Sequence, residues 1–239
     1  MHLYDAPYLN LLHQRFAAVK RRSHELLHAG PGQTVVDVGC GLGHDAAVLA
    51  TTGATVIGLD PNEALLNEAW YLHGQQVEFR NGTAQAMGLA DTSVDALRYE
   101  RVLQHLTDHD AVLAEAHRVL HPGGRLQVVD TDWLSMTVFL PDAALERKLI
   151  DSIATRYCCC SALLRLLPSA LLHHGFKPSA MELCNVLTEI FAAIDSVVHQ
   201  FVAAEIATGH FTNAEQASWQ QANKYCFIHN FLLIQAVKP

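Results

Sequence analysis

Over the first 132 residues, short apolar runs alternate with stretches in which apolar residues recur every three or four positions. The short runs are rich in valine, isoleucine and leucine, as buried strands are, and lie at residues 34–38, 54–60, 77–81, 94–99 and 124–132. The stretches between them with a helical period are 45–52, 62–73 and 108–120. Strand–helix alternation of this kind predicts a parallel sheet with helices on both faces.

The pattern changes after residue 132. Thr107 with Asp110 and Thr212 with Glu215 each have the spacing of a capping box at a helix start, and "HPGG" at 121–124 is expected to stop a helix. We predict a single α/β domain with a Rossmann-like, doubly wound and mostly parallel seven-stranded sheet whose last strand is antiparallel. Its expected parts are a helical lid at 1–30, a core at 31–132, helical lid segments at 133–174 and 189–224, and closing strands at 177–188 and 225–237.

Charge and hydropathy exclude several classes of protein. The 239 residues carry 16 basic and 24 acidic side chains, a net charge of −8, which disfavours nucleic acid as a partner. The one basic cluster, "KRR" at 20–22, is expected to form a solvated helix face. No apolar run is long enough for a membrane helix and the N-terminus lacks the apolar centre of a secretory signal, so we expect a cytoplasmic protein.

Metal binding is not expected from the residues that could supply ligands. The six cysteines include a run at 158–160 but no C-x₂-C spacing, and the 15 histidines form no H-E-x-x-H pattern. The cysteines are interpreted as small packing residues.

The segment "VVDVGCGLGHD" at 35–45 places Gly39, Gly41 and Gly43 directly after a predicted strand. Glycines there let the backbone and a helix N-terminus approach a ligand closely. Asp37 beside this loop would repel a pyrophosphate but suits an ammonium group, and Asp60, which ends the second strand, can accept hydrogen bonds from both hydroxyls of a ribose. A ligand with a ribose, an ammonium group and no phosphate fits this pattern better than a dinucleotide does.

Five segments, "VVDVGCGLGHDAAVLA", "GLDPNEALL", "GTAQAMGLADTSVDAL", "RVLQHLTD" and "LHPGGRLQVVDTDW", together resemble the class I S-adenosylmethionine-dependent methyltransferases, and most closely the UbiE-like small-molecule branch. The resemblance covers about residues 30–132. It implies S-adenosyl-L-methionine as cofactor, with its amino-acid end at Asp37 and the loop from Gly39 through Cys40 and Gly41 to Gly43. It further places the ribose at Asp60, adenine against Pro61 or Asn62 and near Thr83 and Ala84, and the methionine portion along Glu100 and Arg101.

The methyl acceptor is expected to be a small, aromatic or polycyclic metabolite, as in secondary metabolism, and the attacked atom is left open. His105, just past the fourth predicted strand, is the first candidate for a general base, and local packing of its ring is the alternative. Asp132 is the second catalytic candidate. Tyr4, Tyr8, Trp133 and His105 are the candidates for substrate contacts, and a homodimer is left open.

Two other functions compete with methyl transfer. A protein that binds S-adenosylmethionine without transferring its methyl group, such as a cyclase or a regulatory subunit, would carry the same cofactor residues. An NAD-dependent oxidoreductase is disfavoured because His44 stands where the third glycine of a dinucleotide loop belongs.

Overall fold

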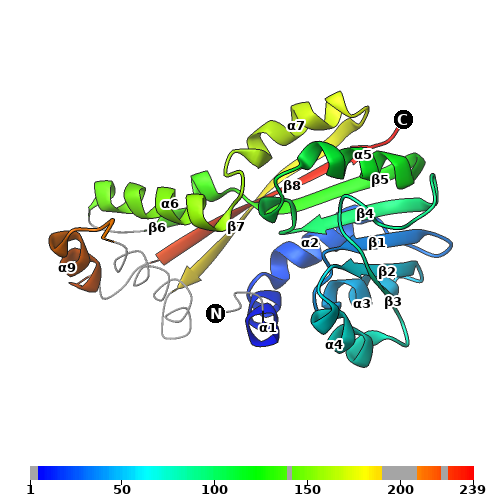
Figure 1. The fold of residues 1–239 in the computed structure, drawn as a ribbon, viewed down its shortest axis with the longest axis horizontal. Coiled ribbons are helices and arrows are strands. Elements are labelled where there is room, and N and C mark those ends of the chain that lie inside the picture. The colour runs from blue at the N-terminus through cyan, green and yellow to red at the C-terminus, as the bar shows by residue number, and fades with distance from the viewer. Residues whose placement is uncertain (1–4, 139–141, 190–208, 222–225) are drawn as a thin grey trace.

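A mixed β-sheet runs the length of the molecule in this computed structural model, which describes residues 5–138, 142–189, 209–221 and 226–239 (Figure 1). The strand order is β3-β2-β1-β4-β5-β8-β6, with β7 paired to β8. The strands are β1 (Thr34–Val38), β2 (Thr55–Asp60), β3 (Glu78–Asn81), β4 (Val94–Glu100), β5 (Leu120–Thr131), β6 (Thr137–Val138), β7 (Lys177–Glu189) and β8 (Cys226–Val237). The first five are parallel and β8 is antiparallel to its neighbours, which confirms the predicted fold and adds only the two-residue β6.

The helices lie on both faces of this sheet (Figure 1). They are α1 (Ala6–Arg15), α2 (Ala17–Leu27), α3 (His44–Ala50), α4 (Glu63–His73), α5 (His109–Val119), α6 (Ala143–Tyr157), α7 (Leu163–His173) and α9 (Asn213–Gln221), with short 3₁₀ helices η1 (Leu103–His105) and η2 (Trp133–Ser135). No helix among the described residues is both long and apolar enough to cross a membrane.

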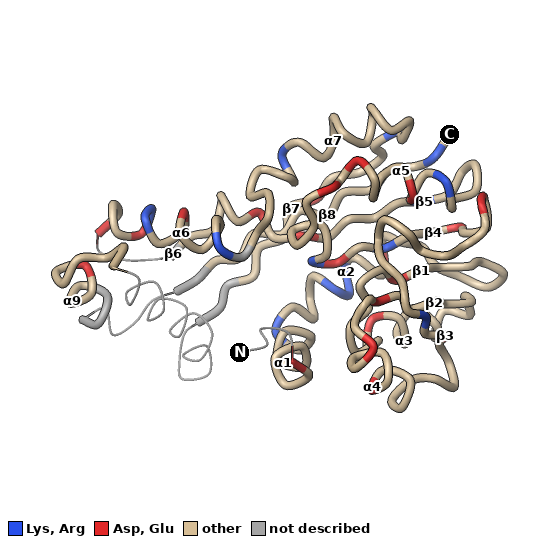
Figure 2. Tube along the Cα trace, viewed as in Figure 1, with Lys and Arg blue, Asp and Glu red and all other residues tan. Residues whose placement is uncertain are grey.

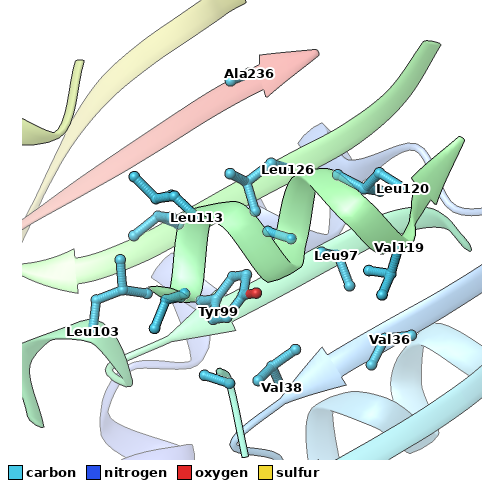
Figure 3. Close-up of a cluster of buried hydrophobic side chains, with 14 of the residues drawn as sticks. Val36, Val38, Leu97, Tyr99, Leu103, Leu113, Val119, Leu120, Leu126 and Ala236 are labelled. Carbon is cyan, nitrogen blue, oxygen red and sulfur yellow. The ribbon is translucent and has the colours of Figure 1, made fainter. Parts of the chain in front are cut away.

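Alternation along β1 separates two cores. Val36 and Val38 point to the face covered by α5 and α7, where they meet Leu97, Tyr99 and Leu113 (Figure 3). Val35 points the opposite way, into a cluster with side chains of α2 and α3. Successive strand residues face opposite sides of a sheet, so the apolar run of β1 fills both cores. Packing on both faces of the sheet thereby fixes the carboxyl ends of the strands side by side.

One predicted helix start is wrong and another is confirmed. The N-cap of α5 is Asp108, whose Oδ1 accepts from the Ala111 N–H at 2.9 Å, and not Thr107. The Asp108 carboxylate caps the helix and also interacts favourably with the positive end of its dipole, so the helix begins one residue later than expected. At α9, Thr212 N–H donates to Glu215 Oε2 at 2.6 Å and Glu215 N–H to Thr212 Oγ1 at 3.2 Å, which is the predicted capping box.

Charged residues of both signs are spread over the described part of the chain, and the segment from Asp37 to Glu78 carries acidic ones alone (Figure 2). The expectation of a solvated "KRR" face is wrong for Lys20, which is 9% exposed on α2. Its ammonium group is buried because it has two carboxylate partners, described below. Arg22, farther along the same helix, is half-buried and pairs with Glu182 of β7 at 2.7 Å.

The predicted lid is only partly within the described residues. The N-terminal helices α1 and α2 are present as expected, whereas Tyr4 and most of 189–224 lie outside the described ranges. Of the described cysteines, Cys158 is buried and Cys159 is exposed, so the packing role expected for the run fits the first and is wrong for the second.

Candidate functional site

A cavity of about 420 Å³ opens at the carboxyl ends of β1, β2 and β4, where α1 and α2 cover the sheet. Its volume is in the range of small-molecule sites. His105 and nearly all the residues predicted to hold the cofactor line this cavity. These cofactor residues are Asp37, Gly39, Cys40, Gly41, Asp60, Pro61, Thr83, Ala84, Glu100 and Arg101. Segments up to 68 residues apart in sequence therefore meet at one edge of the sheet, because parallel strands end there together.

The glycine loop is hydrogen-bonded to the end of β2. Gly39 and Cys40 N–H groups both donate to the Leu59 carbonyl, at 2.6 and 3.1 Å. Asp60 accepts from Gly41 N–H at 2.9 Å and from Asn62 N–H at 2.8 Å, one bond to each carboxylate oxygen. Gly39 and Gly41 have φ of +71° and +54°, a region that glycine enters without strain. The loop thus presents bare backbone to the cavity.

Asp60 keeps acceptor capacity after these two bonds. It is 8% exposed, and burial raises its pKa while the two N–H donors oppose that rise. A carboxylate has about four lone-pair sites, so roughly two stay available for hydroxyl donors. This is the arrangement that a ribose requires.

Gly43 lies behind the cavity. Its φ is +74°, and a Cβ at this position would lie 2.5 Å from Cζ of Phe79 on β3. The glycine is therefore needed so that α3 can begin close against β3. Its predicted contact with a cofactor stays a prediction.

A buried network of charges forms the wall of the cavity under α2. Arg98 of β4 donates to Asp37 at 2.9 Å and also pairs with Glu100. Lys20 donates to Asp45 at 2.5 Å and to Glu100 at 2.6 Å. Sequence reasoning missed Arg98 and Lys20. The available signal was an arginine within an otherwise apolar strand, because a buried charge must be paired.

With Asp37, Asp45 and Glu100 all ionised and His24 neutral, the network has three carboxylates against two cations, a net charge of −1. Burial raises the pKa of Asp37 against the opposing attraction of Arg98. For Asp45 burial acts in the same sense, but Arg98 and Lys20 outweigh it and hold its pKa well below the ordinary value. The excess negative charge faces the cavity beside the glycine loop, so this wall favours a cationic group on a ligand.

Three side chains, of which His105 lines the cavity, form a chain of hydrogen bonds. Trp133 Nε1 donates to Gln104 Oε1 at 2.8 Å, and Gln104 Nε2 lies 2.9 Å from His105 Nε2. Burial, with a contribution from Arg101, lowers the pKa of His105 to about 4. His105 is therefore neutral at pH 7.

The other predicted catalytic and substrate residues are placed differently. Tyr8 packs against the cluster that contains Phe16 and Phe231. Asp132 is 7% exposed with Arg165 at 3.4 Å, and neither it nor Trp133 is among the residues that line the cavity. Their predicted contacts with an acceptor stay predictions.

The N-terminal helix α1 contributes lining residues that sequence reasoning did not single out, namely Leu9, Leu12 and His13. His44, next to the glycine loop, contacts Asn10 of α1 through Nε2 at 2.7 Å and His73 of α4 through Nδ1 at 3.1 Å. The residue in place of a third glycine therefore helps to hold α1 over the loop.

Within the described ranges, no group of three or more histidine, cysteine, aspartate or glutamate side chains is arranged to hold a metal ion.

Comparison with known proteins identifies a family and several relatives. The family described as a methyltransferase domain matches residues 36–128. An uncharacterized methyltransferase of Synechocystis is 30% identical over 159 residues, which cover 62% of this chain and 74% of the relative. The UbiE ubiquinone/menaquinone biosynthesis C-methyltransferase of Rubrivivax gelatinosus is 35% identical over 106 residues, 44% of this chain and 42% of the relative.

An uncharacterized 37.1 kDa protein in transposon TN4556 of Streptomyces fradiae is 34% identical over 197 residues, 79% of this chain. The chain spans 57% of the length of that relative.

Two solved structures share the fold. The YcgJ protein of Bacillus subtilis matches with a TM-score of 0.71 at 18% identity, over 93% of this chain and 98% of its own. The [4+2]-cyclase SpnF matches with a TM-score of 0.60 at 20% identity, over 95% of this chain and 82% of its own. At these identities the likeness concerns the fold alone.

Proposed function

The chain belongs to the class I S-adenosylmethionine-dependent methyltransferases, and on that premise we propose that it transfers a methyl group to a small, aromatic or polycyclic metabolite. The observation that carries the proposal is the joint placement of the glycine loop, Asp60 and His105 in the lining of one cavity. S-adenosylmethionine, the cofactor of this family, supplies an electrophilic methyl group on a positively charged sulfur.

The residues present fit this cofactor. The Asp60 carboxylate has lone pairs left for two ribose hydroxyls. Gly39 and Gly41 line the cavity, and the space that a side chain would fill is taken by Val102 at Gly39 and approached by Leu9 at Gly41. The net negative charge of the Asp37, Asp45 and Glu100 network would attract the ammonium group. We assign the adenine end to the side of the cavity at Pro61, Thr83 and Ala84.

The apolar part of the lining supports an apolar acceptor. Val102 and Leu106 line the same cavity as His105, and α1 adds Leu9 and Leu12. An apolar wall with few polar groups binds flat hydrocarbon surface and keeps water from the methyl group. Alignment of acceptor and methyl group in such a site accounts for much of the rate that methyl transfer needs.

A second candidate function is binding of S-adenosylmethionine without methyl transfer, as for a cyclase. We keep it as the alternative because the [4+2]-cyclase SpnF has the same fold, so the fold is compatible with a reaction other than methyl transfer. A cofactor site alone does not separate the two functions.

The test is to incubate the protein with labelled S-adenosylmethionine and a set of phenolic, enolic and polycyclic metabolites. We expect S-adenosylhomocysteine to form in proportion to a methylated product. A cyclised product without S-adenosylhomocysteine would support the second function, and neither product from any acceptor would contradict the proposed acceptor class.

Replacing His105 with alanine should lower kcat by about 100-fold, because a polar group beside the acceptor is lost. The cofactor affinity should change by no more than a few-fold, since Asp60 and the loop are untouched. Turnover is measured as S-adenosylhomocysteine release and affinity by calorimetry. His121→Ala, which removes an exposed histidine, is the control and should keep the parent rate. An unchanged kcat in His105→Ala would assign His105 to packing.

A further inference from the structure

We propose that Arg101 is a specificity-determining residue of the acceptor site, and that its guanidinium binds a carboxylate carried by the acceptor. The inference rests on the proposed function, which it narrows from aromatic or polycyclic metabolites in general to aromatic or polycyclic acids. Arg101 follows β4 directly and lines the cavity together with Val102 and His105.

The guanidinium of Arg101 has unused hydrogen-bond donors. Arg101 is half-buried, and its Cζ lies 5.5 Å from the centroid of the Phe16 ring, a contact that uses none of the five N–H groups. Among the described residues it has no hydrogen-bond or ion-pair partner for this side chain, and its nitrogens are not among the buried polar atoms that lack a partner. Arg98, on β4 itself, is by contrast paired with Asp37 and Glu100. The donors of Arg101 are therefore open to a ligand.

The backbone at Arg101 has an uncommon conformation. Its φ is +56°, in the left-handed region that residues other than glycine rarely enter. The Arg101 N–H donates to the Val129 carbonyl of β5 at 2.8 Å, which holds this conformation at the end of β4. Conformations of this kind persist where the surrounding structure maintains them, and they cluster at functional sites. The backbone strain therefore favours a functional role for the position of this side chain.

The groups near Arg101 supply little negative charge. Burial, and after it the charge of Arg101, lower the pKa of both His105 and His229 to about 4, so both rings are neutral at pH 7. Burial raises the pKa of Asp130 to about 7, and both of its carboxylate oxygens accept backbone N–H groups. Arg15 of α1 adds a second positive charge near His229. This region is electropositive, and an anionic ligand would supply the missing charge.

The strand order separates this region from the residues proposed to hold the cofactor. Asp60 ends β2 and the glycine loop follows β1, whereas Asp130 lies on β5 and His229 on β8. Because β4 lies between β1 and β5, the groups on which Arg101 acts are on the side of β4 away from the proposed ribose site. The acidic network under α2 suits the ammonium group of the cofactor, and Arg101 offers the opposite charge for the acceptor.

A carboxylate on an apolar ring system fits these features together. A guanidinium binds a carboxylate through two parallel N–H···O bonds, which fix its orientation as well as its charge. Leu12 and Leu106 line the same cavity and offer apolar surface for the rings. The amino-acid end of the cofactor also carries a carboxylate, so the experiment has to separate these two sources.

The experiment is calorimetric titration of the whole protein, saturated with S-adenosylhomocysteine at pH 7, with 2-naphthoate and with its neutral amide, 2-naphthamide. We expect the parent protein to bind the acid at least about 10-fold more tightly than the amide, because only the acid forms charge-assisted bonds. In Arg101→Gln this preference should fall to about 2-fold or less, and the affinity for S-adenosylhomocysteine should stay within about 3-fold of the parent value.

Two further variants separate charge from geometry and from general effects. Arg101→Lys keeps the charge but cannot form two parallel bonds, so it should retain only part of the preference for the acid. It also replaces Arg101→Gln if that variant does not fold. Arg21→Gln removes an exposed arginine of α2 that does not line the cavity, and it should keep the parent preference.

Equal binding of acid and amide by the parent protein would overturn the inference, as would a full preference for the acid in the Arg101 variants. A loss of about 10-fold or more in S-adenosylhomocysteine affinity in Arg101→Gln would assign Arg101 to the cofactor carboxylate, which also overturns it. These measurements need no turnover. A protein that shows the preference but forms no methylated product would therefore contradict the proposed methyl transfer and not the binding of a carboxylate by Arg101.

Discussion

Replacing Asp60 with alanine should weaken the binding of S-adenosylhomocysteine by about 30-fold or more, equivalent to ~2 kcal/mol. Two effects act in the same direction. The ribose hydroxyls would lose a charged acceptor in a site that is only 8% exposed. The Gly41 N–H, now held at 2.9 Å, would lose the carboxylate that keeps the glycine loop in its binding conformation. Calorimetric titration of parent and variant measures the difference directly.

Asp95→Ala is a matched control for this prediction. Asp95 also uses its carboxylate to accept a backbone N–H, that of Thr34 at 2.7 Å, but it does so near the start of β4 and away from the cavity. Its loss should cost stability and leave affinity within a factor of two or so. Equal affinities for the parent and Asp60→Ala would show that Asp60 holds no part of the cofactor.

The sequence pattern was sufficient for the sheet and for the cofactor loop because both depend on local features. Alternation and apolar runs identified β1 to β5, and the spacing of Gly39, Gly41 and Asp60 placed three groups at the ends of two neighbouring strands. Strand ends meet at the sheet edge whatever the packing details are.

The charge network could not be predicted in the same way, because its contacts join distant positions. Lys20 and Glu100 lie 80 residues apart, and their contact depends on how α2 docks on the sheet. The sequence at 20–22 does not indicate whether its basic side chains face solvent or a buried carboxylate. The hydrogen bond from the Trp133 indole N–H to Gln104 was likewise not predicted from the sequence. The partner of the indole is a neighbour in space and not in sequence.

Replacing Arg98 with methionine should lower the free energy of unfolding by about 3 to 5 kcal/mol, the range for breaking a buried ion pair by removing one partner. The Arg98 side chain is 1% exposed, with Asp37 at 2.9 Å and Glu100 also in contact. Methionine fills much of the volume, so the loss would come from carboxylates left buried without their cation. Urea denaturation of both proteins at pH 7 measures the difference.

Arg118→Met tests whether burial is the cause. Arg118 also pairs with two carboxylates, Asp91 and Glu115, but its side chain is 36% exposed. Exposed pairs contribute about 0 to 1 kcal/mol, so this variant should lose far less stability than Arg98→Met. If Arg98→Met lowers the unfolding free energy no more than Arg118→Met does, the buried network does not depend on Arg98 for its stability.

The pH dependence of the Arg98→Met deficit follows from Asp37. Burial already raises the pKa of this carboxyl, and Arg98 is the main group that opposes the rise. Without Arg98 the folded-state pKa would rise further above the unfolded value, so the folded state would bind a proton more readily than the unfolded chain as the pH falls. The loss of unfolding free energy in Arg98→Met is fully present above the raised pKa of Asp37. It shrinks below that pKa, because burying a neutral carboxyl costs less free energy than burying a carboxylate. The difference in unfolding free energy between parent and variant should therefore narrow as the pH falls below 7, and a difference that widens would contradict the assignment of the loss to an unpaired carboxylate.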